Sequence, residues 1–323
     1  MNALVQVQAS GFRALPPGSL IGIVAPAGPV APERLARVEP LFAAAGWRVR
    51  LYPGCGQRHA DYLAGTDEQR LADLHAAFAD DEVAAVHCLR GGYGCMRLLD
   101  RIDTALLRAR PKLLIGYSDI TALQALLARE GLPSLHAPMP GSDLVLPGRE
   151  AERDALFALL REGCAAGTTW APALDGVASA GLCLPGVADG LLAGGNLSLV
   201  AALLGTRWAW PLHGALLFLE DISEEPYRVD RLLTQLRLAG AFEQVAGVLL
   251  GSFTGSGSPR AVLEELLLPL CRERGLPLLG GWPAGHASPN RPLPMGLRAR
   301  LDAGAGTLTL LQPLLQPAAP AAA

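Results

Sequence analysis

Short apolar runs alternate with amphipathic stretches along the first 140 residues of the chain. The apolar runs predict strands at 20–26, 47–53, 83–89, 112–116 and 134–138. Between them, apolar residues recur at helical spacing and predict helices at 32–45, 67–80 and 119–130, the last ending at Gly131. Buried strands that alternate with helices are typical of a parallel sheet covered on both faces. We therefore expect a doubly wound α/β domain in the N-terminal half.

The pattern weakens after residue 140 and resumes in a second unit. A helix is predicted over 149–162, and the Gly-, Ala- and Pro-rich stretch after it is typical of a linker. The second unit then shows a strand, a turn and a helix over 190–205, strands at 214–221 and 245–253, and helices at 227–240 and 259–274. The predicted division is an N-terminal domain (1–150), a linker (151–186), a C-terminal domain (187–310) and a flexible tail (311–323).

Composition excludes several classes of protein. Half of the 323 residues are hydrophobic and 18% are charged, which is enough apolar material for a substantial core. The net charge of -3, without a basic run, gives no reason to expect nucleic acid or an anionic membrane as a partner. The first residues show no signal peptide, and no apolar run approaches the roughly 18 residues of a membrane span. We expect a cytoplasmic protein.

The six cysteines are scattered, and none belongs to a C-x-x-C pair. This spacing favours neither a zinc site nor a disulfide framework. We expect reduced, mostly structural thiols and no bound metal.

A glycine-bearing loop, "LRGGYG", directly follows the predicted strand at 83–89. It is not a dinucleotide fingerprint, because Arg97 stands where the third glycine belongs, and no G-K-[ST] follows to make it a P-loop. Successive glycines let backbone N–H groups converge on a negative charge, but they also permit a tight strand-to-helix turn. The loop alone leaves both interpretations open.

Ser118 stands at a second such corner, in "LLIGYSDITAL". A sharp turn between a strand and a helix can expose a hydroxyl at the edge of a sheet. The nucleophile-elbow pattern G-x-S-x-G is only half met, because Ile120 replaces the second glycine, so an ordinary α/β-hydrolase is disfavoured. The alternative is structural: Ser118 or Asp119 would cap the following helix.

A nucleophilic serine needs a base and an acid that orients the base. His286 lies in "GGWPAGHASPNRPLPMG", where Gly and Pro fix the backbone and leave a side chain presented. Glu220 ends the apolar strand "GALLFLE" and so also lies at a sheet edge. The alternatives are a surface histidine without a role and a solvated acidic loop that continues through Asp221.

Ordered motifs over residues 20–303 together resemble the LD-carboxypeptidases, which are also called muramoyltetrapeptide carboxypeptidases. The motifs are "IVAPAGP", "YLAGTDEQRLADLHAAFAD", "CLRGGYG", "IGYSDITAL", "LAGGNLSLV", "LFLEDISEEPYRVDRLL" and "GHASPNRPLPMG". The resemblance implies a flavodoxin-like N-terminal domain and a β-rich α/β C-terminal domain, with the active site in the cleft between them. It also implies a catalytic triad of Ser118, Glu220 and His286, with no metal or organic cofactor.

The resemblance gives the remaining residues expected roles. Ser118 is expected to attack, His286 to move the proton and Glu220 to orient the imidazole. The N–H groups of Gly92 and Asp119 are expected to form the oxyanion hole, with Gly91 as a neighbouring alternative.

The neighbouring Arg90 and Tyr93 are candidate contacts to substrate, together with Gly91. Arg90 either binds a terminal carboxylate or forms a structural ion pair.

The expected reaction releases D-alanine from the murein tetrapeptide L-Ala-γ-D-Glu-meso-diaminopimelate-D-Ala during cytoplasmic peptidoglycan recycling. The family also implies a homodimer.

Two further functions are alternatives. Microcin-immunity peptidases resemble this family and cleave an amide between an amino acid and a nucleotide, which requires an aromatic shelf for the base. The candidate shelf residues are Trp170, Trp208, Trp210 and Trp282. The other alternative is a non-catalytic two-domain protein that binds a ligand between its domains.

Overall fold

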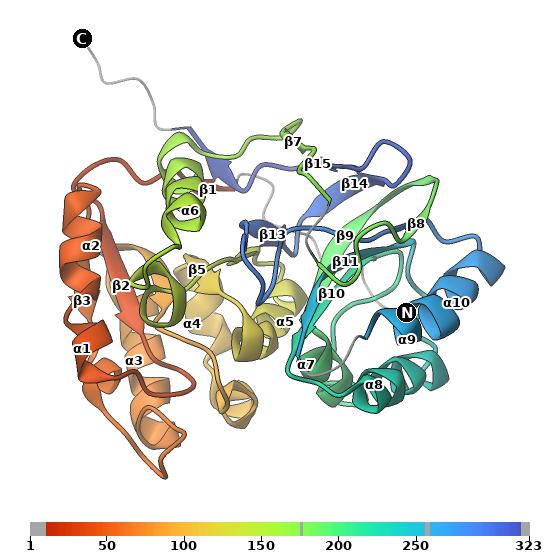
Figure 1. Ribbon diagram of the computed structural model, residues 1–323. Helices are drawn as coiled ribbons and strands as arrows, with labels where there is room; N and C mark the ends of the chain where they lie inside the picture. The colour runs from red at the N-terminus through yellow and green to blue at the C-terminus, as the bar shows by residue number, and fades with distance from the viewer. Residues whose placement is uncertain (1–10, 175–176, 256–258, 318–323) are drawn as a thin grey trace.

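The computed structural model describes residues 11–174, 177–255 and 259–317 of the chain. A six-stranded and an eight-stranded sheet lie side by side. The N-terminal half of the chain lies around the first sheet and most of the C-terminal half around the second (Figure 1). The mixed α/β class with two sheets agrees with the sequence prediction.

The first sheet has the strand order β13-β6-β5-β4-β2-β3. Its strands are β2 (Leu20–Val24), β3 (Arg48–Leu51), β4 (Val83–Cys88), β5 (Leu113–Gly116), β6 (Ser134–His136) and β13 (Leu293–Met295). β2 to β6 pair in parallel, and their spatial order is second, first, third, fourth, fifth. This is the flavodoxin-like order. The strands predicted in the first half are therefore confirmed.

Helices and short helical turns surround this sheet. The helices are α1 (Pro32–Leu35), α2 (Val38–Ala44), α3 (Asp67–Ala79), α4 (Thr104–Ala109), α5 (Thr121–Arg129) and α6 (Glu150–Glu162). The turns are η1 (Pro53–Gly56), η2 (Cys95–Arg97), η3 (Leu99–Arg101), η4 (Ser118–Ile120) and η5 (Pro140–Leu144). Helix α3 begins with a capping box between Thr66 and Gln69. Such a box satisfies N–H groups that the first turn leaves without partners.

The single helix predicted over 32–45 is wrong, because the structure has two short helices there. Pro40 explains the break. Proline lacks an N–H donor, and its ring would clash with the carbonyl of residue 36 in a continuous helix. The chain therefore turns at residues 36–37 and restarts as α2.

The second sheet has the strand order β7-β15-β14-β9-β10-β11-β12-β8. Its strands are β7 (Thr169–Trp170), β8 (Cys183–Leu184), β9 (Val187–Asn196), β10 (Leu216–Ile222), β11 (Gly247–Thr254), β12 (Leu278–Leu279), β14 (Arg298–Asp302) and β15 (Thr307–Leu310). β9 to β12 are parallel, whereas the remaining neighbours pair antiparallel.

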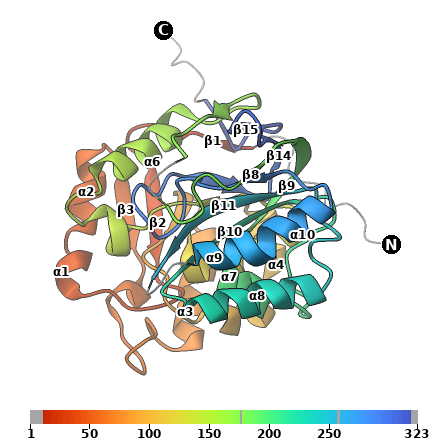
Figure 2. The same cartoon turned by 45° about the vertical axis from the view of Figure 1, so that its right-hand side comes forward.

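Figure 2 shows α8, α9 and α10 lying together over one face of β9–β11. The helical elements of this half are α7 (Leu197–Ala202), α8 (Pro226–Leu238), α9 (Arg260–Val262), η6 (Leu263–Leu267) and α10 (Leu268–Glu273). The last three form one run, as predicted for 259–274. The run widens to a π-turn at η6, one turn before Pro269. A proline at this position removes an N–H donor and disfavours a regular helix in the preceding turn.

The ends of the chain and the predicted linker contribute strands that the sequence patterns did not indicate. β1 (Phe12–Arg13) pairs with β16 (Leu315–Gln316), and Leu315 is fully buried. The expectation of a flexible tail is therefore wrong for residues 315–316, while residues 318–323 lie outside the described residues. Within the predicted linker, β7 and β8 join the two edges of the second sheet.

The chain crosses between the sheets near its C-terminal end. It leaves β12 in the second sheet, runs through residues 280–292, adds β13 to the first sheet beside β6, and returns to the second sheet as β14. A hydrogen bond from the Asn196 backbone N–H to the Thr121 hydroxyl also joins the two halves, at 3.1 Å. The loop at 280–292 is thus held at both ends, each by a different sheet.

The cysteines form no disulfide in the described part of the chain. All six cysteines are free, and five of them are buried. Across the described ranges, no group of three or more His, Cys, Asp or Glu side chains could hold a metal ion. No described helix is both long and apolar enough to cross a bilayer.

Candidate active site

Ser118 occupies a strained turn at the carboxyl end of β5. Its φ of 64° places it in the left-handed region, which costs a non-glycine residue about 1–3 kcal/mol. The turn depends on Gly116, where an added Cβ would lie 3.0 Å from the Ile120 side chain. The strand therefore turns sharply into η4 and leaves the Ser118 side chain half-buried. This is the geometry of a nucleophile elbow, although the sequence lacks the second glycine of that motif.

The glycine loop after β4 packs directly against this serine. A Cβ at Gly91 would lie 2.9 Å from Ser118 Cβ and 3.1 Å from its Oγ. The buried Asp119 carboxylate accepts a hydrogen bond from the Cys95 N–H at 2.8 Å and so fastens the loop to the nucleophile turn. Burial raises the pKa of the Asp119 carboxyl. The backbone N–H groups of Gly92 and Asp119 donate no hydrogen bond to any acceptor among the described residues.

Glu220 and His286 form a buried pair. His286 Nδ1 lies 2.7 Å from Glu220 Oε2, and the Glu220 side chain is fully buried at the end of β10. Burial lowers the pKa of His286, but the charge and hydrogen bond of Glu220, aided by the charges of Asp221 and Asp143, outweigh it, so the pKa lies above its usual value. The carboxylate fixes the tautomer that places a proton on Nδ1 and leaves Nε2 free to accept one.

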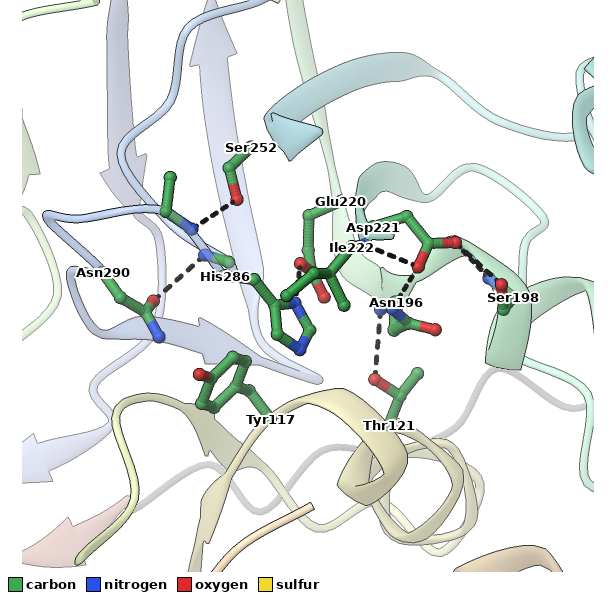
Figure 3. A network of polar contacts seen from close by, with 12 residues as sticks. Tyr117, Thr121, Asn196, Ser198, Glu220, Asp221, Ile222, Ser252, His286 and Asn290 are labelled. Carbon is green, nitrogen blue, oxygen red and sulfur yellow. Dashed lines mark hydrogen bonds and ion pairs between the residues drawn. The ribbon is translucent and has the colours of Figure 1, made fainter. Parts of the chain in front are cut away.

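The loop that carries His286 is fastened on both sides of the imidazole. The Gly285 N–H donates to Asn290 Oδ1 at 3.0 Å, and the Ala287 N–H donates to the Ser252 hydroxyl at 3.1 Å (Figure 3). Gly285 has no room for a side chain, because a Cβ there would lie 2.6 Å from Glu220 Oε2. Glycine at 285 therefore allows the loop to approach the carboxylate closely.

The Tyr117 ring packs against the imidazole from the side of the first sheet. The Tyr117 ring centroid lies 4.8 Å from that of His286, and the Tyr117 hydroxyl donates to Asp143 at 2.9 Å. His136 packs against Tyr117 and Phe218, and burial lowers its pKa to about 4. His136 is therefore neutral near pH 7 and adds no positive charge beside the Glu220–His286 pair.

The residue after Glu220 serves the scaffold. Asp221 points away from His286 and accepts hydrogen bonds from Asn196 Nδ2 and from both the N–H and the hydroxyl of Ser198, each between 2.8 and 3.0 Å. These bonds join the end of β10 to the start of α7 (Figure 3). The acidic stretch that begins directly after Glu220 is therefore not uniformly solvated.

The structure brings the three predicted triad residues to the junction of the two sheets. Glu220 and His286 are in direct contact, and Ser118 directly follows Tyr117, whose ring packs on the imidazole. Among the described residues, no hydrogen bond joins the Ser118 hydroxyl to His286. The capping alternative is wrong, because neither η4 nor α5 has a side-chain cap and the Asp119 carboxylate instead accepts from the Cys95 N–H.

Of the predicted substrate contacts, Arg90 donates to the Pro29 carbonyl at 3.0 Å and forms no salt bridge with a described carboxylate. The Tyr93 side chain is 51% exposed. Of the four candidate shelf residues, Trp170 and Trp282 both line a cavity of about 570 Å³, whereas Trp210 is buried and Trp208 donates to Asp100.

Sequence reasoning missed the residues that contact or anchor the three candidate triad residues and the loops that carry them. These are Ser252, Asn290, Asn196, Tyr117 and Asp143. Asn290 lies in the same loop as His286, between Pro289 and Pro292. A polar amide in such a rigid segment could have been recognised as a candidate anchor from the sequence. Ser252 lies inside an apolar strand and gave no such signal.

Two family models match the chain. The LD-carboxypeptidase N-terminal domain matches residues 21–137, and the LD-carboxypeptidase C-terminal domain matches residues 189–301. Together they cover most of the chain and include Ser118 in the first match and both Glu220 and His286 in the second.

Curated relatives match over most of their length. A putative carboxypeptidase of Streptomyces coelicolor is 43% identical over 93% of this chain and 96% of its own. The murein tetrapeptide carboxypeptidase of Pseudomonas aeruginosa is 38% identical over 75% of this chain and 80% of its own.

Solved structures share the fold. The crystal structure of a muramoyltetrapeptide carboxypeptidase from Oxalobacter formigenes superposes with a TM-score of 0.78 at 31% identity, covering 93% of this chain and all of that one. The microcin C7 self-immunity protein MccF reaches a TM-score of 0.81 at 22% identity, covering 94% of this chain and 99% of its own. At that identity the second likeness shows the fold alone.

Proposed function

The chain belongs to the LD-carboxypeptidase family, and from that premise we propose that it is a serine peptidase that releases the C-terminal D-alanine of murein tetrapeptide. The single observation that carries the proposal is the Glu220–His286 contact of 2.7 Å beside the strained turn at Ser118. The names of the relatives in Pseudomonas and Oxalobacter support the substrate.

In the proposed mechanism, Ser118 Oγ attacks the carbonyl carbon of the bond between the L-centre of diaminopimelate and D-alanine. His286 Nε2 takes the hydroxyl proton and later passes it to the amine of the departing D-alanine. Glu220 holds the imidazole in the required tautomer and stabilises the imidazolium that forms. Water then hydrolyses the acyl-enzyme, with His286 acting again as the base.

The oxyanion hole is part of the same proposal. The N–H groups of Asp119 and Gly92 have no acceptor among the described residues. Asp119 directly follows Ser118 in the chain, and Gly92 directly follows Gly91, which packs against Ser118. Gly91 is the closer of the two glycines to Ser118 and is the alternative donor. One such donor contributes about 3–4 kcal/mol to stabilising the transition state.

The setting of the reaction is also proposed. We place the protein in cytoplasmic peptidoglycan recycling and expect it to act as a homodimer, because the family implies both. Light scattering on purified protein tests the dimer, and a monomeric mass over a range of concentrations would contradict it.

The experiment that tests the function is D-alanine release from free murein tetrapeptide, followed by mass spectrometry without added metal. Wild type and Ser118→Ala are compared at equal concentration. Release by wild type and not by Ser118→Ala is expected. Equal release by both would mean that Ser118 is not the nucleophile, and release by neither would mean that the substrate is wrong.

A further inference from the structure

A cavity of about 280 Å³ opens where the strand order of the first sheet reverses. The chain proceeds from β2 to β3 on one side, and β4 then lies on the other side of β2. The cavity is lined by residues that follow these three strands, including Gly28, Arg58, Tyr62, Arg90 and Tyr93. Ligands of open α/β sheets bind beyond the carboxyl ends of the strands at such a reversal.

The lining of this cavity suits an anion. Arg58 and Arg90 both contribute guanidinium groups, whereas Asp61 is the one carboxylate among the lining residues that the structure describes. Arg58 donates to the Asp61 backbone carbonyl at 3.3 Å and Arg90 to the Pro29 carbonyl at 3.0 Å, but neither forms a salt bridge with a described carboxylate. Because a guanidinium carries five N–H donors, each has donors left for a ligand.

Nearby arginines behave differently. Arg70 is fully buried and is paired with Asp67, and Arg97 is paired with the same carboxylate. Of these four arginines, Arg58 and Arg90 lack a salt bridge to a described carboxylate, and both line the cavity.

Two tyrosines form the outer wall. The Tyr62 and Tyr93 ring centroids lie 5.8 Å apart, and each side chain is 51% exposed. Exposed aromatic rings beside a cationic site provide apolar contact area for a small side chain such as a methyl group.

The loop at 90–93 connects the cavity to the nucleophile. A Cβ at Gly91 would lie 3.1 Å from Ser118 Oγ, and one at Gly92 would lie 3.7 Å from Arg90 Nη2. Gly91 therefore lies next to the nucleophile, and Gly92, the next residue of the same turn, lies next to the guanidinium. In a substrate, the carboxylate carbon of the last residue lies within about 4 Å of the carbon that Ser118 attacks, because one N and one Cα separate them.

We propose that Arg58 and Arg90 bind the free carboxylate of the C-terminal residue of the substrate, and that Tyr62 and Tyr93 contact its side chain. This inference rests on the proposed peptidase function. It explains why the enzyme would remove a terminal residue and would leave internal bonds intact, since only a chain end offers a carboxylate at that distance.

The test compares tetrapeptides that differ only in the last group, a free carboxylate or a carboxamide. We expect the wild-type kcat/KM for the peptide with the free carboxylate to be roughly 10- to 100-fold higher than for the carboxamide. This is the size of effect expected when a charge-assisted hydrogen bond is lost. Arg58→Gln and Arg90→Gln are expected to lose most of this preference through a raised KM on the acid, because a contact made equally in ground and transition states leaves kcat largely unchanged. Arg272→Gln on α10, over the other sheet, is the matched control.

Binding measurements separate this inference from the proposed function. Calorimetry with Ser118→Ala measures the dissociation constant of each peptide without turnover. We expect the peptide with the free carboxylate to bind at least tenfold more tightly than the carboxamide. Equal binding of both peptides would overturn the inference even if wild type releases D-alanine.

A third peptide, with D-isoglutamine in place of D-glutamate, removes an internal carboxylate instead. Suppose wild type prefers D-glutamate over D-isoglutamine and the two arginine variants lose that preference, while they keep the preference for a terminal carboxylate over a carboxamide. The cavity would then bind the internal carboxylate, and the inference would be wrong.

Discussion

Gly91 shows how one missing side chain shapes the nucleophile. The Gly91→Ala substitution would place a methyl carbon 2.9 Å from Ser118 Cβ, which requires the serine or the loop to shift. Because a displacement of about 1 Å in a reacting group costs around 100-fold in rate, kcat is expected to fall by about that factor. Gly304→Ala, in the β14–β15 turn, is the control, since a Cβ there meets its nearest atom at an ordinary 3.5 Å. Wild-type kcat for Gly91→Ala would show that the close packing is not needed.

Glu220 controls the protonation of His286. Burial lowers the pKa of His286, and the Glu220 charge and hydrogen bond raise it above the usual value. Because His286 must be neutral to accept a proton, kcat/KM is expected to fall as the pH drops through an apparent pKa that lies above the ordinary value of a histidine.

In Glu220→Gln the effect of burial prevails, so the pKa of His286 is expected to shift downward, and kcat to fall by about 10⁴-fold. NMR titration of the His286 ring measures the pKa directly. An unchanged titration in Glu220→Gln would rule out this pairing.

The loop at 280–292 is hydrogen-bonded on both sides of His286, the proposed base. Asn290→Ala removes the acceptor of the buried Gly285 N–H, at a cost of about 1–3 kcal/mol. We expect a lower melting temperature and a reduced kcat with little change in KM, because the imidazole loses its fixed position while the substrate contacts remain. Ser288→Ala, an exposed position in the same loop, is the control. If both variants kept wild-type kcat, the anchoring of the loop would not matter for catalysis.

Sequence patterns predicted the long elements of this fold and missed the short ones. The strands β2, β4 and β10 consist mostly of apolar residues, and α3 has a capping box at its start, so local sequence suffices for them. Strands such as β7, β8 and β12 have two residues each and exist because a neighbouring strand accepts their hydrogen bonds. Pairing of this kind depends on the whole fold and leaves no periodic signal.

At the scale of the whole molecule, the site depends on a crossing that no local pattern indicates. β13 belongs by sequence to the second half but completes the first sheet, so the loop between β12 and β13 presents His286 across the junction. Ser118, Glu220 and His286 could be singled out from the sequence because each lies near a predicted strand end or in a Gly- and Pro-rich loop. Their supporting partners could not, because those contacts join distant segments.

The division of the chain at residues 150 and 187 stays a proposal. The two family matches, which end at 137 and begin at 189, support it. The crossing of β13 means that neither part contains its complete sheet. We therefore expect the separately expressed halves to fold poorly, and a cooperative thermal transition for 1–150 alone would contradict this.

The central claim is that Ser118 is a nucleophile activated by His286. The most direct measurement is the rate at which a fluorophosphonate labels the protein, read by intact mass and peptide mapping for wild type, Ser118→Ala and His286→Ala. We predict one adduct on Ser118 in wild type, none in Ser118→Ala, and labelling slowed by at least about 100-fold in His286→Ala. An adduct on another residue, or equal labelling rates in wild type and His286→Ala, would contradict the claim.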